Sequence, residues 1–267
     1  MTRIAVCLIS GGIDSTTCLY HAYEATPSYA QVYGVSIDYG QRHVKEIEYA
    51  KVSCAALGVP HETLKNPQIF PTSMLTDSNV DVPDISYSDI TGISPTYVPF
   101  RNGTMLALLT AYTTGKLKQI EATEERMAQG EAISGHVPPY PPVEADIYFG
   151  AHAEDAANWA YPDCTPEFIG AMANAIYVGS YRQIRLVTPL EWMNKRQIIE
   201  HGTRLGVKWE NTWSCYKGLR LQCGTCPTCR SRREGFINAH IPDPTDYAES
   251  PATFPERMDV GVSKSIG

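Results

Sequence analysis

A short polar string near the N-terminus, Ser10-Gly11-Gly12-Ile13-Asp14-Ser15, has the composition of an anion-binding loop. The strand-like run Ile4–Ile9 precedes it, and the helical pattern of Thr16–Tyr23 follows. Glycines let a backbone approach an anion closely, and the free amides and positive dipole end of a helix face the same space. The string lacks a Walker-type lysine and differs from the dinucleotide fingerprint. A tight capped turn is the simpler alternative, but the whole string after a first strand favours a phosphate site.

Four cysteines crowded near the C-terminus offer soft metal ligands at close spacing. Four thiolates suit tetrahedral zinc with no open position for water, which makes such a site structural. Redox-active or buried cysteines and an iron–sulfur cluster are the alternatives. The predicted metal ligands are Cys215, Cys223, Cys226 and Cys229. The cysteines scattered through apolar stretches are expected to be small buried hydrophobes, and they are Cys7, Cys18, Cys54 and Cys164.

Hydrophobic periodicity predicts alternating strands and helices around these motifs. Because the strands are separated by helices, they should form a parallel sheet with right-handed crossovers, and the fold class is α/β. Strands are expected at Ile4–Ile9, Val32–Ile37, His61–Leu64, Ile147–Ala151 and Ile184–Val187. Helices are expected at Thr16–Tyr23, Val44–Leu57, Gly103–Thr113, after the N-cap Thr165, and at Asn194–Leu205, which Gly206 ends.

The remaining segments lack a lasting period. Asn66–Pro95 is expected to be a long loop with Thr96–Pro99 as a strand end, and Glu121–Pro142 to be an inserted excursion. The chain after Trp213 is expected to be irregular. The predicted organisation is a nucleotide-binding domain over 1–206, a small zinc-binding C-terminal subdomain over 207–247, and an irregular tail over 248–267.

Length and charge narrow the class of function. The chain has 267 residues, 43% of them hydrophobic, which is enough for one sizeable core. Its formal net charge of −7 argues against a nucleic-acid partner, because nucleic-acid binders carry an excess of Lys and Arg. No apolar stretch approaches the roughly 20 residues that cross a membrane, and Ile4–Ile9 is too short for a signal peptide. We therefore expect a cytoplasmic protein without a membrane or nucleic-acid partner that acts on a small molecule.

The string Ser10–Ser15 resembles the SGGxDS pyrophosphatase loop of the N-type ATP pyrophosphatases. Members of that superfamily cleave ATP to AMP and pyrophosphate and adenylate a substrate oxygen. The resemblance implies a Rossmann-like, parallel five-stranded sheet with flanking helices, and a role for Asp14 in organising Mg²⁺ and the phosphates. It implies ATP contacts at Ile9, Ser10, Gly11, Gly12, Asp14, Ser15 and Thr16.

Further strings, together with the cysteine spacing, resemble the QueC family of 7-cyano-7-deazaguanine synthases from about Ile4 to Tyr247. Singly they are weak, but their order along the chain makes the resemblance specific. The strings are Ser10–Cys18, Asp38–His43, Tyr97–Asn102, Tyr161–Phe168, Thr188–Leu190 with Lys195, Thr212–Tyr216, and Asp243–Thr245.

By this resemblance, 7-carboxy-7-deazaguanine attacks the α-phosphate of ATP, and ammonia converts the acyl adenylate into an amide. A second ATP activates the amide oxygen, and loss of AMP leaves the nitrile, 7-cyano-7-deazaguanine. Positioned cations and amides stabilise the charge that builds on the α-phosphate. The resemblance also implies a homodimer, with ATP, Mg²⁺ and a structural Zn²⁺ as cofactors.

Several side chains in these strings have candidate roles. Arg101 is a forked cation suited to a phosphate or carboxylate, with a surface salt bridge as the alternative. Lys195 either meets the phosphates or solvates the start of a helix. Asp163 either contacts the substrate or caps the following helix, and His43 is expected to be structural rather than a proton shuttle. The predicted catalytic residues are Asp14, Arg101 and Lys195, and the predicted substrate contacts are Arg101, Tyr161 and Asp163.

The sequence departs from the resembled family in two places. Phe100 stands where the family usually has Gly before Arg-Asn, which affects the backbone next to Arg101. Glu121–Pro142 is extra chain, and it precedes Ile147–Asp155, whose end should face the site in an open parallel sheet. An insertion there is expected to bear on substrate or product handling.

Three other functions remain open at the level of sequence. In the first, the reaction stops at the amide, 7-amido-7-deazaguanine, which is used for DNA modification. In the second, the chain is a tRNA-modifying enzyme of the same superfamily that forms lysidine or thiolates tRNA, although its acidic charge argues against this. In the third, the chain is a non-catalytic, zinc-stabilised nucleotide-binding protein.

Overall fold

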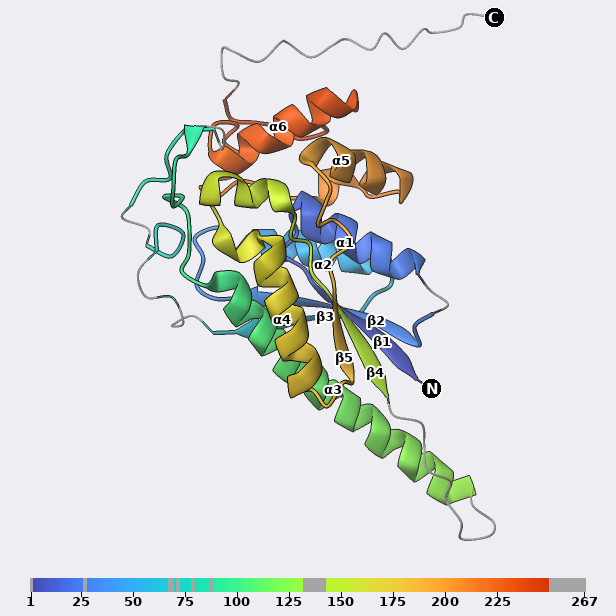
Figure 1. Ribbon diagram of the computed structural model, residues 1–267. Coiled ribbons are helices and arrows are strands. Elements are labelled where there is room, and N and C mark those ends of the chain that lie inside the picture. The colour runs from blue at the N-terminus through green and yellow to red at the C-terminus, as the bar shows by residue number, and fades with distance from the viewer. Residues whose placement is uncertain are drawn as a thin grey trace, which may run out of the picture.

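The computed structural model describes residues 2–25, 28–66, 70, 73–77, 80–86, 89–131 and 143–249. Five parallel strands form one sheet in the order β3-β2-β1-β4-β5 (Figure 1). This arrangement confirms the predicted α/β class and the Rossmann-like sheet. The strands are β1 Arg3–Leu8, β2 Gln31–Asp38, β3 His61–Lys65, β4 Glu144–Tyr148 and β5 Ile184–Val187, so β4 begins three residues before the predicted strand.

Helices cover both faces of the sheet because alternate side chains of each strand point to opposite sides. On one face, Ala5 and Cys7 pack with α1 (Ile13–Glu24), α2 (Glu46–Ala56) and α5 (Lys195–Arg204). On the other, Val6 and Leu8 pack with α3 (Arg101–Glu131) and α4 (Pro166–Gly179). The last helix, α6 (Pro227–Ala239), packs against α5. The result is a three-layer α/β/α unit with two apolar cores.

Local signals at helix ends behave as predicted. Thr165 is the N-cap of α4, where its hydroxyl accepts a hydrogen bond from the Phe168 N–H at 3.2 Å. Asn194 and Gln197 form a capping box at the start of α5, with both hydrogen bonds present. Gly206 follows the end of that helix with a φ of 80°, a conformation that favours glycine.

The helix predicted at Gly103–Thr113 is much longer, because α3 continues to Glu131. The first half of the predicted excursion Glu121–Pro142 is therefore helix, and 132–142 lies outside the described residues. The second half of α3 extends past the sheet (Figure 1). It therefore carries few apolar residues, and its hydrophobic periodicity is too weak to predict a helix there. The insertion leads into the amino end of β4, at the opposite edge of the sheet from the phosphate loop. The described part of the insertion, 121–131, therefore lies at the amino ends of the strands, away from the phosphate loop (Figure 1).

Three other expectations require comment. Thr96–Pro99 is not a strand, since its described residues form a turn before α3. The chain after Trp213 is not wholly irregular, because it contains α6. Short 3₁₀ helices, η2 (Ala153–Trp159), η3 (Pro162–Cys164) and η4 (Trp209–Asn211), fill other connections. The predicted domain division remains a prediction, and its tail beyond residue 249 lies outside the described residues. In the part of the chain that the structure describes, no helix meets the length and hydropathy needed to span a membrane.

Candidate functional site

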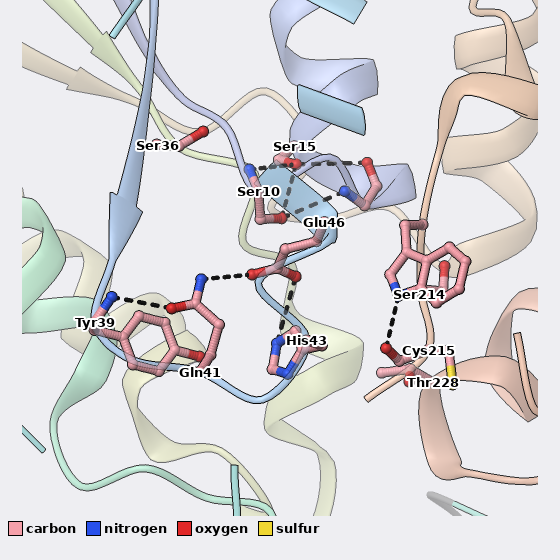
Figure 2. A network of polar contacts seen from close by, with 12 residues as sticks. Ser10, Ser15, Ser36, Tyr39, Gln41, His43, Glu46, Ser214, Cys215 and Thr228 are labelled. Carbon is pink, nitrogen blue, oxygen red and sulfur yellow. Dashed lines mark hydrogen bonds and ion pairs between the residues drawn. The ribbon is translucent and has the colours of Figure 1, made fainter. Parts of the chain in front are cut away.

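The phosphate loop connects β1 to α1 in the geometry that the sequence predicted. Gly11 has a φ of 84°, and a Cβ atom there would lie 2.3 Å from the backbone oxygen of Glu46. Only glycine fits that position. The Ser15 hydroxyl accepts from the Ser10 N–H at 3.1 Å and lies 3.0 Å from the Ser10 hydroxyl, which fixes the loop (Figure 2). The N-cap Gly12 supplies no side-chain hydrogen bond, so backbone amides at the start of α1 remain available to an anion.

The loop forms one wall of a cavity of about 200 Å³ at the carboxyl edge of the sheet. The three predicted catalytic residues, Asp14, Arg101 and Lys195, all line this cavity, although they are distant in sequence. Of the predicted ATP contacts, those that line it are Ile9, Ser10, Gly12, Asp14 and Ser15. Gly11 and Thr16 are buried and do not line it.

Asp14 and Lys195 form an ion pair on the cavity wall. The Lys195 ammonium donates to both carboxylate oxygens of Asp14 at 2.7 and 2.8 Å, and it lies 3.0 Å from Nε2 of His152. Burial raises the pKa of Asp14, but the charge of Lys195 and the other favourable contacts outweigh it, so this pKa lies below its usual value. Burial lowers the pKa of Lys195, while the charge of Asp14 raises it, and the net direction is upward. Both groups are therefore ionised.

His152 and Asp155 were not predicted as site residues. They follow β4, and their side-chain ligand atoms lie within 4.8 Å of one another and of Asp14. Asp155 also lines the cavity. A sequence signal was present, because polar residues directly after a strand of an open parallel sheet lie at its ligand-binding edge. Two carboxylates and an imidazole form a group that attracts a cation, and in this structure the ammonium of Lys195 lies beside it.

Arg101 is the first residue of α3 rather than a residue after a strand, which corrects the element predicted before it. Burial acts to lower its pKa, but nearby groups, among them Tyr39 and Asp163, leave it well above the usual value. Arg101 is therefore a permanent cation on the cavity wall, at the start of α3, while Lys195 is at the start of α5. Phe100 before it has a φ of 54°, the left-handed region for which the resembled family uses Gly.

Tyr161 and Asp163 do not line the cavity. The Tyr161 hydroxyl lies 3.0 Å from the hydroxyl of Ser94, and both side chains are buried. An oxygen of Asp163 accepts from the Asn102 N–H at 3.0 Å, so it caps the start of α3, whereas Thr165 caps the following helix. Their predicted role as substrate contacts remains a prediction, while their visible role is to hold the residues next to Arg101.

The first residue of α2, Glu46, brings into the cavity a carboxylate that the sequence reasoning missed. Figure 2 shows Glu46 between Gln41 and His43 and below Ser10. Its Oε1 accepts from Gln41 Nε2 at 3.1 Å, and its Oε2 lies 3.4 Å from His43 Nε2. The signal for Glu46 was its place in the first turn of a helix that follows the second strand. The prediction that His43 is structural is untested, although its ring is 2% exposed.

The four predicted metal ligands meet in one buried cluster. The Sγ atoms of Cys215, Cys223, Cys226 and Cys229 lie within 4.8 Å of one another, and those of Cys223 and Cys229 are 3.8 Å apart. Sulfurs bound to one zinc ion at about 2.3 Å in a tetrahedron lie about 3.8 Å apart. Backbone N–H groups also donate to these sulfurs, from Cys223 to Cys215 at 3.3 Å and from Cys226 to Cys223 at 3.3 Å. The cluster has the donors and spacing of a four-thiolate metal site.

The cysteine cluster and the cavity share a segment of chain. Ser214 and Tyr216 flank the first cysteine ligand, Thr228 precedes the last, and all three line the cavity. Figure 2 shows Ser214, Cys215 and Thr228 on the right and Tyr39 and Gln41 on the left, with Glu46 and His43 drawn between them. A metal bound at the cysteines would therefore support one wall of the cavity.

Comparisons with known proteins agree with this geometry. The family model described as queuosine biosynthesis protein QueC matches residues 4–124 and 143–240, so the extra chain is confirmed for 125–142. A 7-cyano-7-deazaguanine synthase of Caldicellulosiruptor bescii is 36% identical over 246 residues, which cover 91% of this chain and 96% of that protein. Proteins of the same name from Thermoplasma volcanium and Thiobacillus denitrificans are 34% identical over 264 residues and 38% identical over 257 residues. These matches cover 97% and 93% of this chain, and 96% and 100% of the relatives. The chain belongs to the QueC family.

Proposed function

We propose that this chain is a cytoplasmic 7-cyano-7-deazaguanine synthase. It converts 7-carboxy-7-deazaguanine and ammonia to 7-cyano-7-deazaguanine with ATP, through an adenylated acid and an adenylated amide. The observation that carries the proposal is the meeting of the phosphate loop, Arg101 and Lys195 around one cavity, in a chain that matches its named relatives over almost all of their length. Neither the amide-forming nor the tRNA-modifying alternative has a comparable observation in its favour.

In this proposal, the loop amides and the hydroxyls of Ser10 and Ser15 bind the phosphates of ATP. Asp14 is ionised and suits a Mg²⁺ ion, which neutralises phosphate charge when it is bound. Lys195 leaves the carboxylate of Asp14 to meet the phosphates, and Arg101 holds the substrate carboxylate or the α-phosphate from the start of α3. Tyr161 and Asp163 act from behind the cavity wall, where Asp163 holds the start of α3 and so positions Arg101 for the substrate.

The cysteine cluster binds Zn²⁺ in this proposal. Four thiolates leave no open position on the metal, so the zinc is structural. In this proposal the enzyme is a homodimer. It has no nucleic-acid partner, because its formal net charge is −7 and its substrate is a small molecule.

The deciding experiment incubates the purified protein with ATP, Mg²⁺, ammonium and 7-carboxy-7-deazaguanine, and follows the products by mass spectrometry. We expect the nitrile, with AMP and pyrophosphate as the nucleotide products and two ATP consumed per nitrile. Asp14→Ala should abolish turnover while thermal unfolding remains cooperative. The amide as final product supports the first alternative, and release of ADP and phosphate alone contradicts adenylation.

A further inference from the structure

Glu46 lies at the start of a helix, but its side chain is mostly buried and held in place in the cavity wall. It is the first residue of α2, its side chain is 13% exposed, and it lines the cavity that holds the phosphate loop. Its own backbone oxygen packs directly on Gly11 of that loop. The main chain of Glu46 is thus fixed beside the place where the phosphates bind, and its side chain projects into the same space (Figure 2).

The groups that hold the carboxylate do not neutralise it. Gln41 donates to Oε1, and this amide is itself anchored, since its oxygen accepts from the Tyr39 N–H at 2.9 Å. His43 lies beside Oε2, but burial lowers its pKa to about 3, and the charges of Arg101 and Arg42 act in the same direction. A neutral ring orients the carboxyl group without giving it a charged partner.

The other carboxylates on the cavity wall are differently placed. Asp14 is bound by the ammonium of Lys195, and Asp155 lies 3.3 Å from His152. Burial raises the pKa of Glu46 to about 8, against the lowering effects of the Gln41 hydrogen bond and the Arg101 charge. Among the described residues that line the cavity, Glu46 is the carboxylate that combines a fixed position with a high proton affinity.

We propose that Glu46 accepts protons from the nitrogen atom during the two steps that make the amide and then the nitrile. This inference rests on the proposed function, because it assigns a residue to the nitrogen half of that reaction. Glu46 lies beside the phosphate loop and lines the same cavity as Arg101, whose charge acts on its carboxyl group. An adenylate held by the loop and Arg101 would therefore present its acyl carbon to the cavity that Glu46 faces. Near neutral pH, most ammonia is protonated to ammonium, which has no free electron pair for attack.

The proton balance of the reaction requires a proton acceptor in both steps. In the first step, an N–H bond of ammonium breaks and an O–H bond forms on Glu46, which frees the electron pair that attacks the acyl carbon. The added nitrogen then loses a second proton to solvent, the C–O bond to AMP breaks, and the electrons of that bond leave on the AMP oxygen. In the second step, the adenylated amide loses its remaining N–H protons as its C–O bond to AMP breaks and the C≡N bond forms. Glu46 passes each proton to solvent before it accepts the next.

A competing role for Glu46 is recognition of the base, since a carboxylate accepts well from the N–H and amino groups of a deazaguanine. The two roles differ in the step that they affect. A base contact is needed for adenylation of the acid, which involves no ammonia. A proton acceptor for nitrogen is needed only after the adenylate has formed.

The test separates these steps in the full-length, zinc-loaded protein. ATP–pyrophosphate exchange that depends on 7-carboxy-7-deazaguanine, measured without ammonium, reports adenylation. Product formation with ammonium reports the nitrogen steps. Hydroxylamine is largely unprotonated near neutral pH, so hydroxamate formation reports attack by a nucleophile that needs no deprotonation before it attacks. The variants are Glu46→Gln and, as a matched control on the same helix, Glu48→Gln, whose side chain is 67% exposed and pairs with Lys51.

We expect Glu46→Gln to lower the ammonium-dependent rate by about 10²-fold or more, while exchange and hydroxamate formation stay within about threefold. Glu48→Gln should leave all three rates unchanged. In Glu46→Ala, which leaves space for a small acid, added formate should restore part of the ammonium-dependent rate and have no effect on exchange. Rescue of this kind is not expected from a group that only supports the fold.

Three results overturn the inference. A normal ammonium-dependent rate in Glu46→Gln shows that the carboxylate is not used. Loss of exchange in both Glu46 variants, or a raised KM for 7-carboxy-7-deazaguanine with kcat unchanged, assigns Glu46 to binding or to the fold. An equal loss with ammonium and hydroxylamine shows that it does not act on the proton. Absence of substrate-dependent exchange in the wild type instead contradicts the proposed function itself.

Discussion

Asp14 and Glu46 are carboxylates on the wall of one cavity, and their surroundings move their pKa values in opposite directions. Asp14 lies against the ammonium of Lys195, which keeps it ionised. Among the described residues, the close partners of the Glu46 carboxyl group are an amide and a neutral imidazole, and burial raises its pKa to about 8. At the scale of single residues, the neighbouring side chains and not the residue type therefore decide whether a carboxyl group stays ionised, as Asp14 does, or has a high proton affinity, as Glu46 does.

The raised pKa of Glu46 makes the stability of the protein depend on pH in a definite direction. The ordinary pKa of this group is 4.5, and it is about 8 in the folded chain, so between these values the folded state holds a proton that the unfolded state has lost. This group's contribution to stability therefore decreases as the pH rises from about 4.5 to 8. We expect Glu46→Gln to raise the unfolding temperature relative to wild type more at pH 8 than at pH 5. A difference that is constant across this range, or that has the opposite slope, contradicts the assignment, and Glu48→Gln is the control.

Arg101 should contribute to catalysis rather than to stability. If it holds a phosphate or the substrate carboxylate, Arg101→Ala removes charge-assisted hydrogen bonds worth roughly 1.5–3 kcal/mol each. Catalytic efficiency should then decrease about tenfold or more for each bond. Arg101→Lys should restore only part of the loss, because an ammonium lacks the planar fork. Steady-state kinetics with a thermal-unfolding control test this, and near-normal kcat/KM in a folded Arg101→Ala would remove Arg101 from the site.

At the scale of elements, the start of α3 shows how a side chain replaces a glycine. Phe100 has a φ of 54°, and its N–H donates to the Tyr97 hydroxyl at 2.9 Å. Its ring packs edge-on against Phe168 of α4, with the centroids 5.7 Å apart. The ring also covers Gly103, where a Cβ atom would lie 2.4 Å from it. The absence of a side chain at Gly103 thus makes room for the bulky residue before Arg101.

A double-mutant cycle tests this pairing. Gly103→Ala should push the Phe100 ring away from Phe168 and lower the free energy of unfolding by about 1 kcal/mol, the usual worth of such an aromatic contact. In a Phe100→Gly background, the same substitution should have a smaller effect, because no ring remains to be displaced. Urea unfolding measures both effects. Equal effects of Gly103→Ala in the two backgrounds would show that the ring and the glycine are independent.

The segment with the cysteine cluster should depend on its metal. We expect about one zinc per chain, since four thiolates complete a tetrahedral shell. Cys226→Ser leaves the metal three-coordinate, so it should lower both the zinc content and the unfolding temperature. Activity should decrease as well, because Ser214 and Thr228 of this segment line the cavity. Elemental analysis and calorimetry provide the measurement, with Cys18→Ser, outside the cluster, as a control for zinc content. Iron in the purified protein, or no metal, contradicts the zinc assignment.

At the scale of the whole molecule, the site and the described part of the extra chain, 125–131, lie at opposite edges of the sheet. The phosphate loop, Arg101 and Lys195 gather at the carboxyl ends of the strands, while α3 extends past the amino ends (Figure 1). The ends of the unmatched segment 125–142 are close together, because Thr2 contacts both sides. Its hydroxyl donates to Glu124 at 2.6 Å, and its carbonyl accepts from the Glu144 N–H at 3.0 Å.

Replacement of 125–142 by a short Gly-Ser linker should therefore leave catalysis intact. We expect kcat and KM to change by no more than about twofold, because distant loop changes are tolerated when their ends are close. The unfolding temperature should change little, since the contacts of Glu121 and Glu124 with the body are kept. Loss of activity in a folded deletion variant would show that this segment acts on the site or on assembly.

Several features of this protein were determined by its sequence alone. The parallel α/β class, the phosphate loop and the four-cysteine cluster could be predicted because each depends on neighbours in the chain. Glycine freedom at Gly11, the capping residues Thr165 and Asn194, and close cysteine spacing are local properties. Helix α3 was harder to delimit, because its end extends past the sheet and needs no continuous apolar face.

Other features were decided only by the tertiary structure. The pairing of Asp14 with Lys195 and His152, and the placement of Glu46 beside the phosphate loop, join segments far apart in the chain. The prediction that Asp163 contacts substrate remains a prediction, but its hydrogen bond from the Asn102 N–H is a contact that only the fold shows. A side chain's pKa and its partners depend on burial and on charges supplied by other elements. For this reason the sequence identified the chemistry of the loop, while the fold decided which carboxylates are paired and which one is left to accept a proton.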